Sequence, residues 1–148
     1  MDADVAVSWM TDRRTGIDAN LLIAAWSGRP PWFRTALTVL EDPARLLIVS
    51  DILWLEVMPK ALYHANVEEA SFYEAVFAKA HCQQITVELI ETAKRLAQVY
   101  GLAAIDAIHI AVLLAADADE FVSGERGTKP MFRVSDLPIV SIWESAEG

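Results

Sequence analysis

The stretch AIDAIHIAVLLAADADEFVS, residues 104–123, gives the clearest indication of the fold. Residues 104–118 are almost wholly apolar, which predicts a helix that is buried on all sides, and Asp106 lies in its first turn. Residues 120–123 follow as a short apolar run that is typical of a buried strand. A buried helix leading directly into a buried strand indicates a protein in which helices cover a sheet.

The same alternation extends through the rest of the chain. Strands are predicted at residues 15–18, 46–50, 84–87, 120–123 and 138–142. Helices are predicted at residues 19–27, 32–41, 67–80, 88–100 and 104–118, and from Ser50-Asp51 toward Lys60. Short apolar strands alternating with helices predict an α/β sandwich of three layers, with a parallel sheet between two layers of helices.

Composition narrows the possible functions. The chain has 148 residues, which suits one domain, and no apolar run approaches the roughly eighteen residues of a membrane span. The net charge is −9, from 21 acids and 12 bases, whereas proteins that bind nucleic acid by general phosphate neutralisation are usually basic. Three explanations stay open: another substrate, a cation among the acids, or a basic partner that covers them.

The start of the sequence and its single cysteine lead us to expect a cytoplasmic protein. The opening MDADVAVSWMTDRR has acids first and bases last, the reverse of a secretory signal. The single cysteine, Cys82, cannot form an internal disulfide and is expected to be a core thiol. The sequence contains no Cys/His cluster with zinc spacing.

Four acids lie where a parallel sheet would gather them. Asp18 and Glu125 follow predicted strands, Glu56 lies in the helix after a strand, and Asp106 opens the apolar helix. Ligands of such folds bind beyond the carboxyl ends of the strands. Converging carboxylates repel one another unless a cation lies among them, and oxygen ligands favour Mg²⁺ or Mn²⁺. Taken singly, Asp18 and Asp106 are equally well explained as helix N-caps, and Glu56 as a solvated helix residue.

Several segments carry a resemblance to a known family. IDANLLIAA, SDILWLEV, YGLAAIDAIHIAVLLAADADEFVSGE and TKPMFRV resemble the PIN-domain family, especially the bacterial VapC-type toxins of toxin–antitoxin pairs. The similarity runs in order over residues 16–142, and the four acids are separated by 38, 50 and 19 residues. The resemblance implies a parallel sheet flanked by helices and hydrolysis of RNA with Mg²⁺ or Mn²⁺ held by the acids.

The resemblance assigns roles to particular residues. Asp18 matches the first metal-binding Asp and Asp106 the central one, so these two are expected to hold the metal. Glu56 matches the helix Glu, Asn20 a small polar supporting residue, and Ser123 the Ser or Thr before the last acid. The last acid of the family is often Asp, whereas here Glu125 is the candidate, and its longer side chain acts directly, through water or not at all.

The N-terminus offers a second possible opening, because MDADVAVSWM also resembles the start of the family. Asp2 would lie 54 residues before Glu56, which is long, so Asp18 is preferred. The single PIN-like domain is therefore expected at residues 15–148, with residues 1–14 an extension of unknown role.

The sequence thus predicts a metal-dependent endoribonuclease toxin with Asp18, Glu56, Asp106 and Glu125 at its catalytic site. The alternative is a PIN-fold module that binds RNA or protein and has lost cleavage; a DNA nuclease is a weaker third option. Arg126, Lys129 and Arg133 form the basic cluster nearest a site acid and are candidates for binding RNA phosphates. The implied partners are a small antitoxin, expected to have a basic tail, and a second copy in a homodimer. His109 is expected to be a buried structural imidazole, with a proton shuttle as the alternative.

Overall fold

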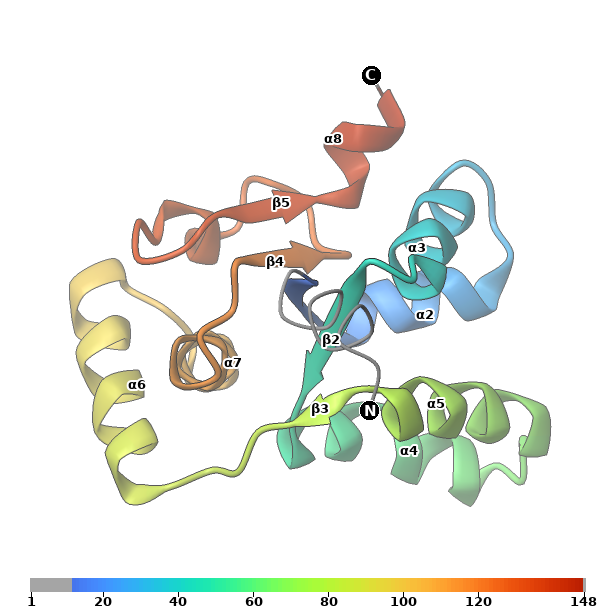
Figure 1. Ribbon diagram of the computed structural model, residues 1–148, viewed down its shortest axis with the longest axis horizontal. Helices are drawn as coiled ribbons and strands as arrows, with labels where there is room; N and C mark the ends of the chain where they lie inside the picture. Colours follow the sequence, from blue (N-terminus) through green and yellow to red (C-terminus); the bar gives the residue numbers. More distant parts are fainter. Residues whose placement is uncertain (1–11, 148) are drawn as a thin grey trace, which may run out of the picture.

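A five-stranded parallel sheet forms the centre of the protein (Figure 1). The computed structural model describes residues 12–147. The strands are β1 (Arg13–Ile17), β2 (Arg45–Val49), β3 (His81–Cys82), β4 (Glu120–Ser123) and β5 (Ile139–Ser141), and they lie in the order β3-β2-β1-β4-β5. The predicted parallel sheet is confirmed.

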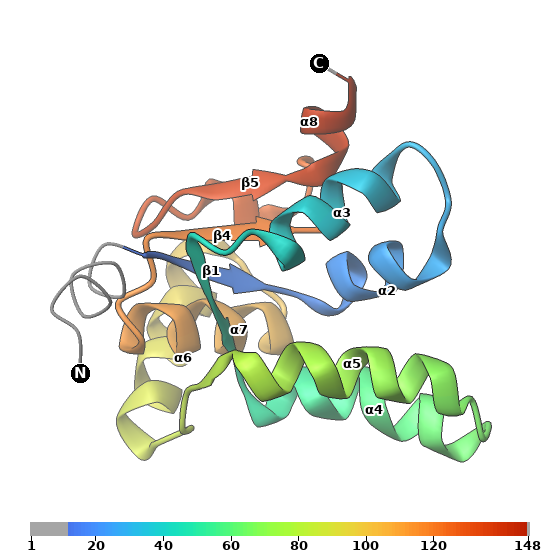
Figure 2. The ribbon, with the colours of Figure 1, turned by 45° about the vertical axis from the view of Figure 1, so that its right-hand side comes forward.

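Helices cover both faces of this sheet (Figures 1 and 2). One face carries α2 (Ala19–Ser27), α3 (Trp32–Glu41), α4 (Asp51–Tyr63) and α5 (Val67–Lys79). The other carries α6 (Val87–Tyr100), α7 (Ala104–Ala115) and the short 3-10 helix η1 (Pro130–Arg133). The short helix α8 (Ile142–Glu147) follows β5 directly. The arrangement is the three-layer sandwich that the sequence predicts.

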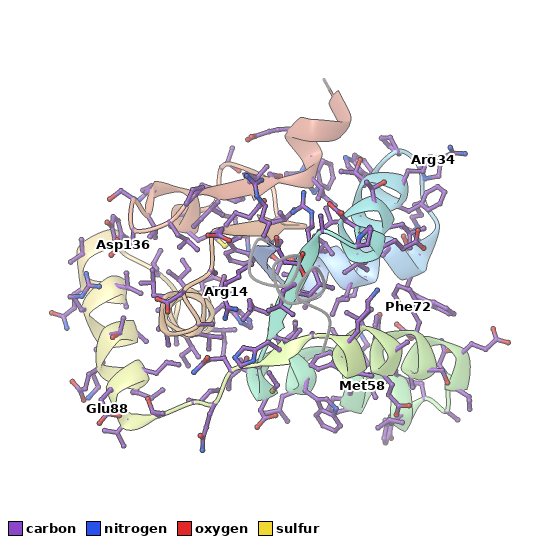
Figure 3. All side chains as sticks on the ribbon, viewed as in Figure 1. Arg14, Arg34, Met58, Phe72, Glu88 and Asp136 are labelled. Carbon is purple, nitrogen blue, oxygen red and sulfur yellow. The ribbon has the colours of Figure 1, made fainter. Side chains whose placement is uncertain are left out.

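The pleat of the strands divides the core into two parts. In β2, Leu47 and Val49 face the α2–α5 side, while Ile48 faces α6 and α7. In β4, Val122 and Phe121 are divided between the two sides in the same way. Successive strand residues point to opposite faces, so a sheet buried on both faces needs uninterrupted apolar strands. Figure 3 shows side chains filling the layers between sheet and helices, with Glu88 and Asp136 toward the outside.

The strand order identifies where a binding site is expected, at the carboxyl ends of β1 and β4. The chain passes from β1 to β2 on one side, and β4 joins β1 on the other. In α/β sheets such a reversal opens a crevice beyond the carboxyl ends of the strands. Ile17 of β1 lies opposite Val122 of β4, so Asp18 and Ser123 follow at the same level.

Two local predictions are wrong. Residues 84–87 form no strand: β3 is only His81–Cys82, and Thr86 is the N-cap of α6, where its hydroxyl accepts from the Leu89 N–H. The Gln84–Val87 alternation thus reflects a helix start. Cys82 is exposed, because β3 is a two-residue strand at the edge of the sheet. The strand predicted at 138–142 is confirmed as β5, and the chain continues from it into α8, which was not predicted.

The predicted N-terminal extension lies largely outside the described residues. β1 begins at Arg13, so residues 13 and 14 belong to the sheet. The possible second opening at residues 1–10 lies outside the described residues. Within residues 12–147, no helix is long and apolar enough to cross a membrane.

Candidate active site

Asp18 occupies the point where β1 ends and α2 begins. It is the N-cap of α2, and its Oδ1 accepts a hydrogen bond from the Leu21 N–H at 2.9 Å. The same Oδ1 accepts from the Gly124 N–H at 2.9 Å, in the loop that follows β4. The N-cap interpretation of Asp18 is therefore correct, but it is incomplete, because the carboxylate also ties two neighbouring strands together.

Ser123 completes the surroundings of Asp18. Its fully buried hydroxyl donates to Oδ2 of Asp18 and accepts from the Glu125 N–H at 2.9 Å. A carboxylate offers about four lone-pair positions, and three of those on Asp18 are now occupied. One position on Oδ2 is left for a ligand. The predicted supporting role of Ser123 has a clear structural basis.

Burial raises the pKa of Asp18 above its ordinary value, although hydrogen bonds from Gly124, Ser123 and Leu21 oppose the rise. Only 7% of the residue is exposed. Taking a carboxylate out of water disfavours its charged form, whereas donors that point at it favour that form. The Asp18 carboxylate is thus one whose charge a nearby cation would stabilise further.

Ser123→Ala tests this arrangement. The change leaves Oδ2 of Asp18 buried without a donor and the Glu125 N–H without its acceptor. We expect the free energy of unfolding to fall by about 1–3 kcal/mol, the usual cost of an unsatisfied buried group. Thermal denaturation measures it. Ser27→Ala is the control, because the Ser27 hydroxyl is exposed and bonds only the nearby Ala24 carbonyl and Arg29 N–H, which water can replace. Equal melting temperatures for the two variants would contradict the assigned role of Ser123.

Glu56 reaches the site from α4 on the opposite flank. Its Oε1 lies 2.5 Å from Nε2 of His109, which is on α7 and only 7% exposed. Glu56 is an exposed helix residue, as the alternative interpretation requires, but its carboxylate also has a buried partner in His109. His109 is buried as predicted, and its contact fixes the carboxylate of Glu56 relative to α7. The sequence spacing of 53 residues gave no sign of this pair.

Asp106 lies in the first turn of α7 but is not its N-cap, a position that Ala103 occupies. Burial is the largest cause that raises the pKa of Asp106, and the charges of Glu125 and Glu56 raise it further. Lys129 and His109 oppose this rise. His109 also lowers the pKa of Asp18, so it lies near both aspartates. The expected rise in carboxylate pKa is therefore present, with burial rather than like charge as its main cause.

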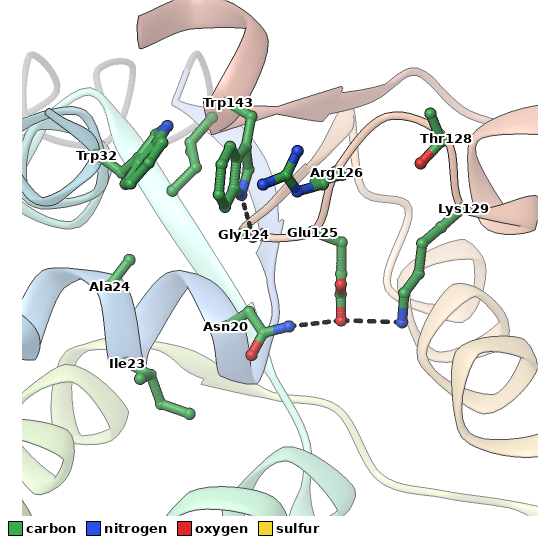
Figure 4. Close-up of a pocket in the computed structure, with 11 residues that line it drawn as sticks. Asn20, Ile23, Ala24, Trp32, Gly124, Glu125, Arg126, Thr128, Lys129 and Trp143 are labelled. Atoms are coloured by element: carbon green, nitrogen blue, oxygen red, sulfur yellow. Dashed lines mark hydrogen bonds and ion pairs between the residues drawn. The ribbon is translucent and has the colours of Figure 1, made fainter.

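Glu125 is held by two side chains at the mouth of a pocket (Figure 4). Its Oε1 accepts from Nδ2 of Asn20 at 2.5 Å and lies 3.2 Å from Nζ of Lys129. Asn20 thus supports the last acid rather than Asp18. The four predicted acids lie near one another at this end of the sheet. Ser123 links Asp18 to the main chain of Glu125. Asp106 lies close enough to Glu125 and Glu56 for their charges to raise its pKa.

The three bases of the predicted cluster make different contacts. Lys129 pairs with Glu125, whereas the guanidinium of Arg126 lies over the ring of Trp143 at 4.1 Å. Arg133 is exposed on η1, and within residues 12–147 it makes no hydrogen bond or ion pair with the acids. Sequence reasoning missed Trp143, because its position in α8 was not predicted.

The carboxylate oxygens at this end of the sheet are ligands that suit a hard divalent cation. Asp18 keeps one open lone-pair position, and the neighbours of Asp106 include two further carboxylates. Within the described residues, no three His, Cys, Asp or Glu side chains form a ready chelating group. Mg²⁺ does not need one, since it keeps several waters and binds through one or two carboxylates together with substrate phosphates. Asp18 and Asp106 fit that mode of binding.

The fold and this site define a class: a parallel α/β protein with a cluster of acids at the topological switch point of its sheet. The family model of the PIN domain matches residues 17–129. The chain belongs to the PIN-domain family. Among curated proteins, none matches this sequence.

Solved structures with the same fold include toxin–antitoxin complexes. A chain of a toxin–antitoxin complex from Klebsiella pneumoniae is 27% identical with a TM-score of 0.64, over 86% of this chain and 97% of that one. DNA-bound VapBC from Salmonella typhimurium is 12% identical with a TM-score of 0.67, and the match covers 88% of this chain and 98% of that one. VapBC2 from Rickettsia felis, bound to a promoter DNA fragment, is 13% identical with a TM-score of 0.66. The match covers 86% of this chain and 98% of that one.

Proposed function

We propose that the protein is a VapC-type toxin, an endoribonuclease that depends on Mg²⁺ or Mn²⁺. The observation that carries the proposal is the placement of Asp18, held by Ser123 and Gly124 at the switch point, beside the other three acids. Membership of the PIN-domain family and the toxin–antitoxin complexes among its structural relatives support it.

Each side chain has a distinct task in this proposal. Asp18 and Asp106 would hold the cation, Glu125 would contribute directly or through water, and Glu56 would orient water at the other flank. A divalent cation bound there supplies a water of lowered pKa and stabilises charge on the phosphodiester. His109 keeps Glu56 in place, and Asn20 and Lys129 keep Glu125 in place.

The decisive assay incubates the protein with structured RNA in Mg²⁺, in Mn²⁺ and in EDTA. Cleavage that needs the cation supports the proposal. RNA left intact in all three conditions by folded protein contradicts it. The same assay with single- and double-stranded DNA separates a ribonuclease from a DNA nuclease of the same fold.

The second candidate is a PIN-fold module that binds RNA or protein without cleaving it. The observation that favours it is that no three potential ligands form a ready group in the described part of the chain. Binding of RNA without cleavage in either metal would favour this candidate. A shift of the melting temperature by Mn²⁺ would argue against it, because a ligand stabilises only the state that binds it.

The acidic surface indicates how the partner would bind. With a net charge of −9, the protein attracts basic segments more readily than RNA. The proposed antitoxin therefore carries a basic tail, with an arginine that pairs with the carboxylates in place of the cation. The planar guanidinium suits this place, since it donates two parallel hydrogen bonds to a carboxylate. A homodimer stays a prediction.

Metal and antitoxin should then compete. We expect Mg²⁺ to weaken antitoxin binding more than NaCl of equal ionic strength, because only Mg²⁺ occupies the carboxylates. Titration calorimetry with a small protein encoded beside this one measures the effect in both salts. NaCl is the control for screening, which acts on both titrations alike. Equal weakening at matched ionic strength would place the tail outside the metal site.

A further inference from the structure

A pocket of about 430 Å³ adjoins the acids, and its far wall is aromatic (Figure 4). Asn20, Glu125 and Lys129 form the border with the acid site. Beyond them, the wall is made of Trp32, Trp143 and Arg126, with Ile23, Ala24 and Ile142 around them. A volume of this size suits a small organic group, and the walls combine apolar surface with a cation. The proposed function gives no role to Trp32 or Trp143, and Arg126 has so far been only a candidate for binding RNA phosphates.

The aromatic wall is a layered stack. The rings of Trp32 and Trp143 have centroids 4.0 Å apart and are tilted by 39°. The guanidinium of Arg126 lies over Trp143, 4.1 Å from the ring centroid. Arg126 is exposed and makes no ion pair within residues 12–147. The stack thus ends in a flat cationic group, whose plane can receive another flat ring.

Trp143 links the stack to the acid site through two sets of hydrogen bonds. Nε1 of Trp143 donates to the Gly124 carbonyl at 2.9 Å, and the Gly124 N–H donates to Asp18. The main-chain N–H of Trp143 donates to the Ser141 hydroxyl, and this hydroxyl donates to the main-chain carbonyl of Glu125. Trp143 is therefore held by the same loop that positions Asp18 and Glu125. A group bound on the wall has a defined position relative to a phosphodiester at the acids.

We propose that the Arg126–Trp143–Trp32 stack binds a nucleobase of single-stranded RNA next to the phosphodiester that is cut. The proposal rests on the proposed function, because it assumes that RNA enters the acid site. Unpaired bases stack on aromatic rings and on guanidinium planes, and this contact depends little on base identity. In an acidic protein, such stacking supplies affinity that overall charge does not. Arg126 therefore acts by its plane rather than as the phosphate contact that the sequence indicates.

Arg126→Lys tests the plane while keeping the charge. Binding is measured by fluorescence anisotropy with a labelled RNA octamer of mixed sequence and with an octamer of abasic ribose phosphates. All variants carry Asp106→Asn, and gels check that the RNA stays intact. We expect Arg126→Lys to weaken binding of the mixed octamer about tenfold, as for loss of one stacked base, and to leave the abasic chain within about twofold.

Arg34→Lys is the matched control, since Arg34 also lies over a ring, Phe33 at 5.8 Å, but lines a different hollow with Arg13 and Glu120. It should change neither affinity. If Arg126→Lys lost equal affinity for both octamers, Arg126 would be a phosphate contact. If it lost affinity for neither, the aromatic wall would not bind RNA bases and would be free to bind a protein partner. Either result overturns the proposal. Wild-type cleavage is assayed separately. Base-dependent binding without metal-dependent cleavage would refute only the ribonuclease, and cleavage without base-dependent binding would refute only the base site.

Discussion

Asp106→Asn should abolish RNA cleavage without unfolding the protein. The amide keeps the shape of the side chain and removes a charge that the cation needs. Metal ions contribute several kcal/mol to such reactions, and each 1.36 kcal/mol is a factor of ten in rate. We therefore expect a loss of about a thousandfold or more in Mg²⁺, measured on labelled RNA under single-turnover conditions.

The control is Asp117→Asn, the same chemical change just beyond the other end of α7, where Asp117 is exposed. It should leave the rate within about twofold, as is usual for an exposed site away from the machinery. Wild-type cleavage by Asp106→Asn would refute the assignment of Asp106.

The stability of Asp106→Asn gives a second readout without metal. Burial, with help from Glu125 and Glu56, raises the folded-state pKa of Asp106 above 3.8, so ionisation at neutral pH costs folding free energy. The variant avoids that cost, and its melting temperature at pH 7 in EDTA should equal or exceed that of the wild type. The difference should vanish below pH 3.8, where the carboxyl is protonated in both states.

Gly124→Ala should be the most destabilising single-methyl change in the site. The added Cβ would overlap the backbone carbon of Asn20 and the backbone nitrogen of Leu21. Backbone cannot swing aside as a side chain can, so the loop would have to leave β4 and withdraw its N–H from Asp18. Overpacking of this kind costs about 1–3 kcal/mol, and the lost hydrogen bond about 1 kcal/mol more.

Gly127→Ala is the matched comparison, three residues along the same loop. Its Cβ would meet only the carboxylate of Glu144, which is exposed and can move. We expect a change within about 0.5 kcal/mol, as for ordinary surface substitutions. Chemical denaturation measures both variants. If Gly124→Ala were as stable as Gly127→Ala, the close approach of this loop to α2 would not be needed for the fold.

The sequence by itself determined the order and type of most elements. The runs at 19–27, 32–41 and 120–123 have the same bounds in the structure, because each combines a clear apolar pattern with a clear start or stop. It also determined that the sheet is parallel, since strands without polar alternation must be covered on both faces. The misplaced strand at 84–87 arose because a helix cap and an edge strand resemble each other over four residues.

The sequence also selected the four acids, but it did not say how they are held. Tertiary structure alone decided that His109 fixes Glu56, that Asn20 serves Glu125, and that Gly124 donates to Asp18. These pairs are separated by 53, 105 and 106 residues. Local patterns report which residues one helix or strand buries. Contacts between elements depend on strand order and on the direction of each side chain, which appear only when the sheet is assembled, and for that reason the stack of Trp143 and Arg126 beside the acids had no counterpart in the sequence.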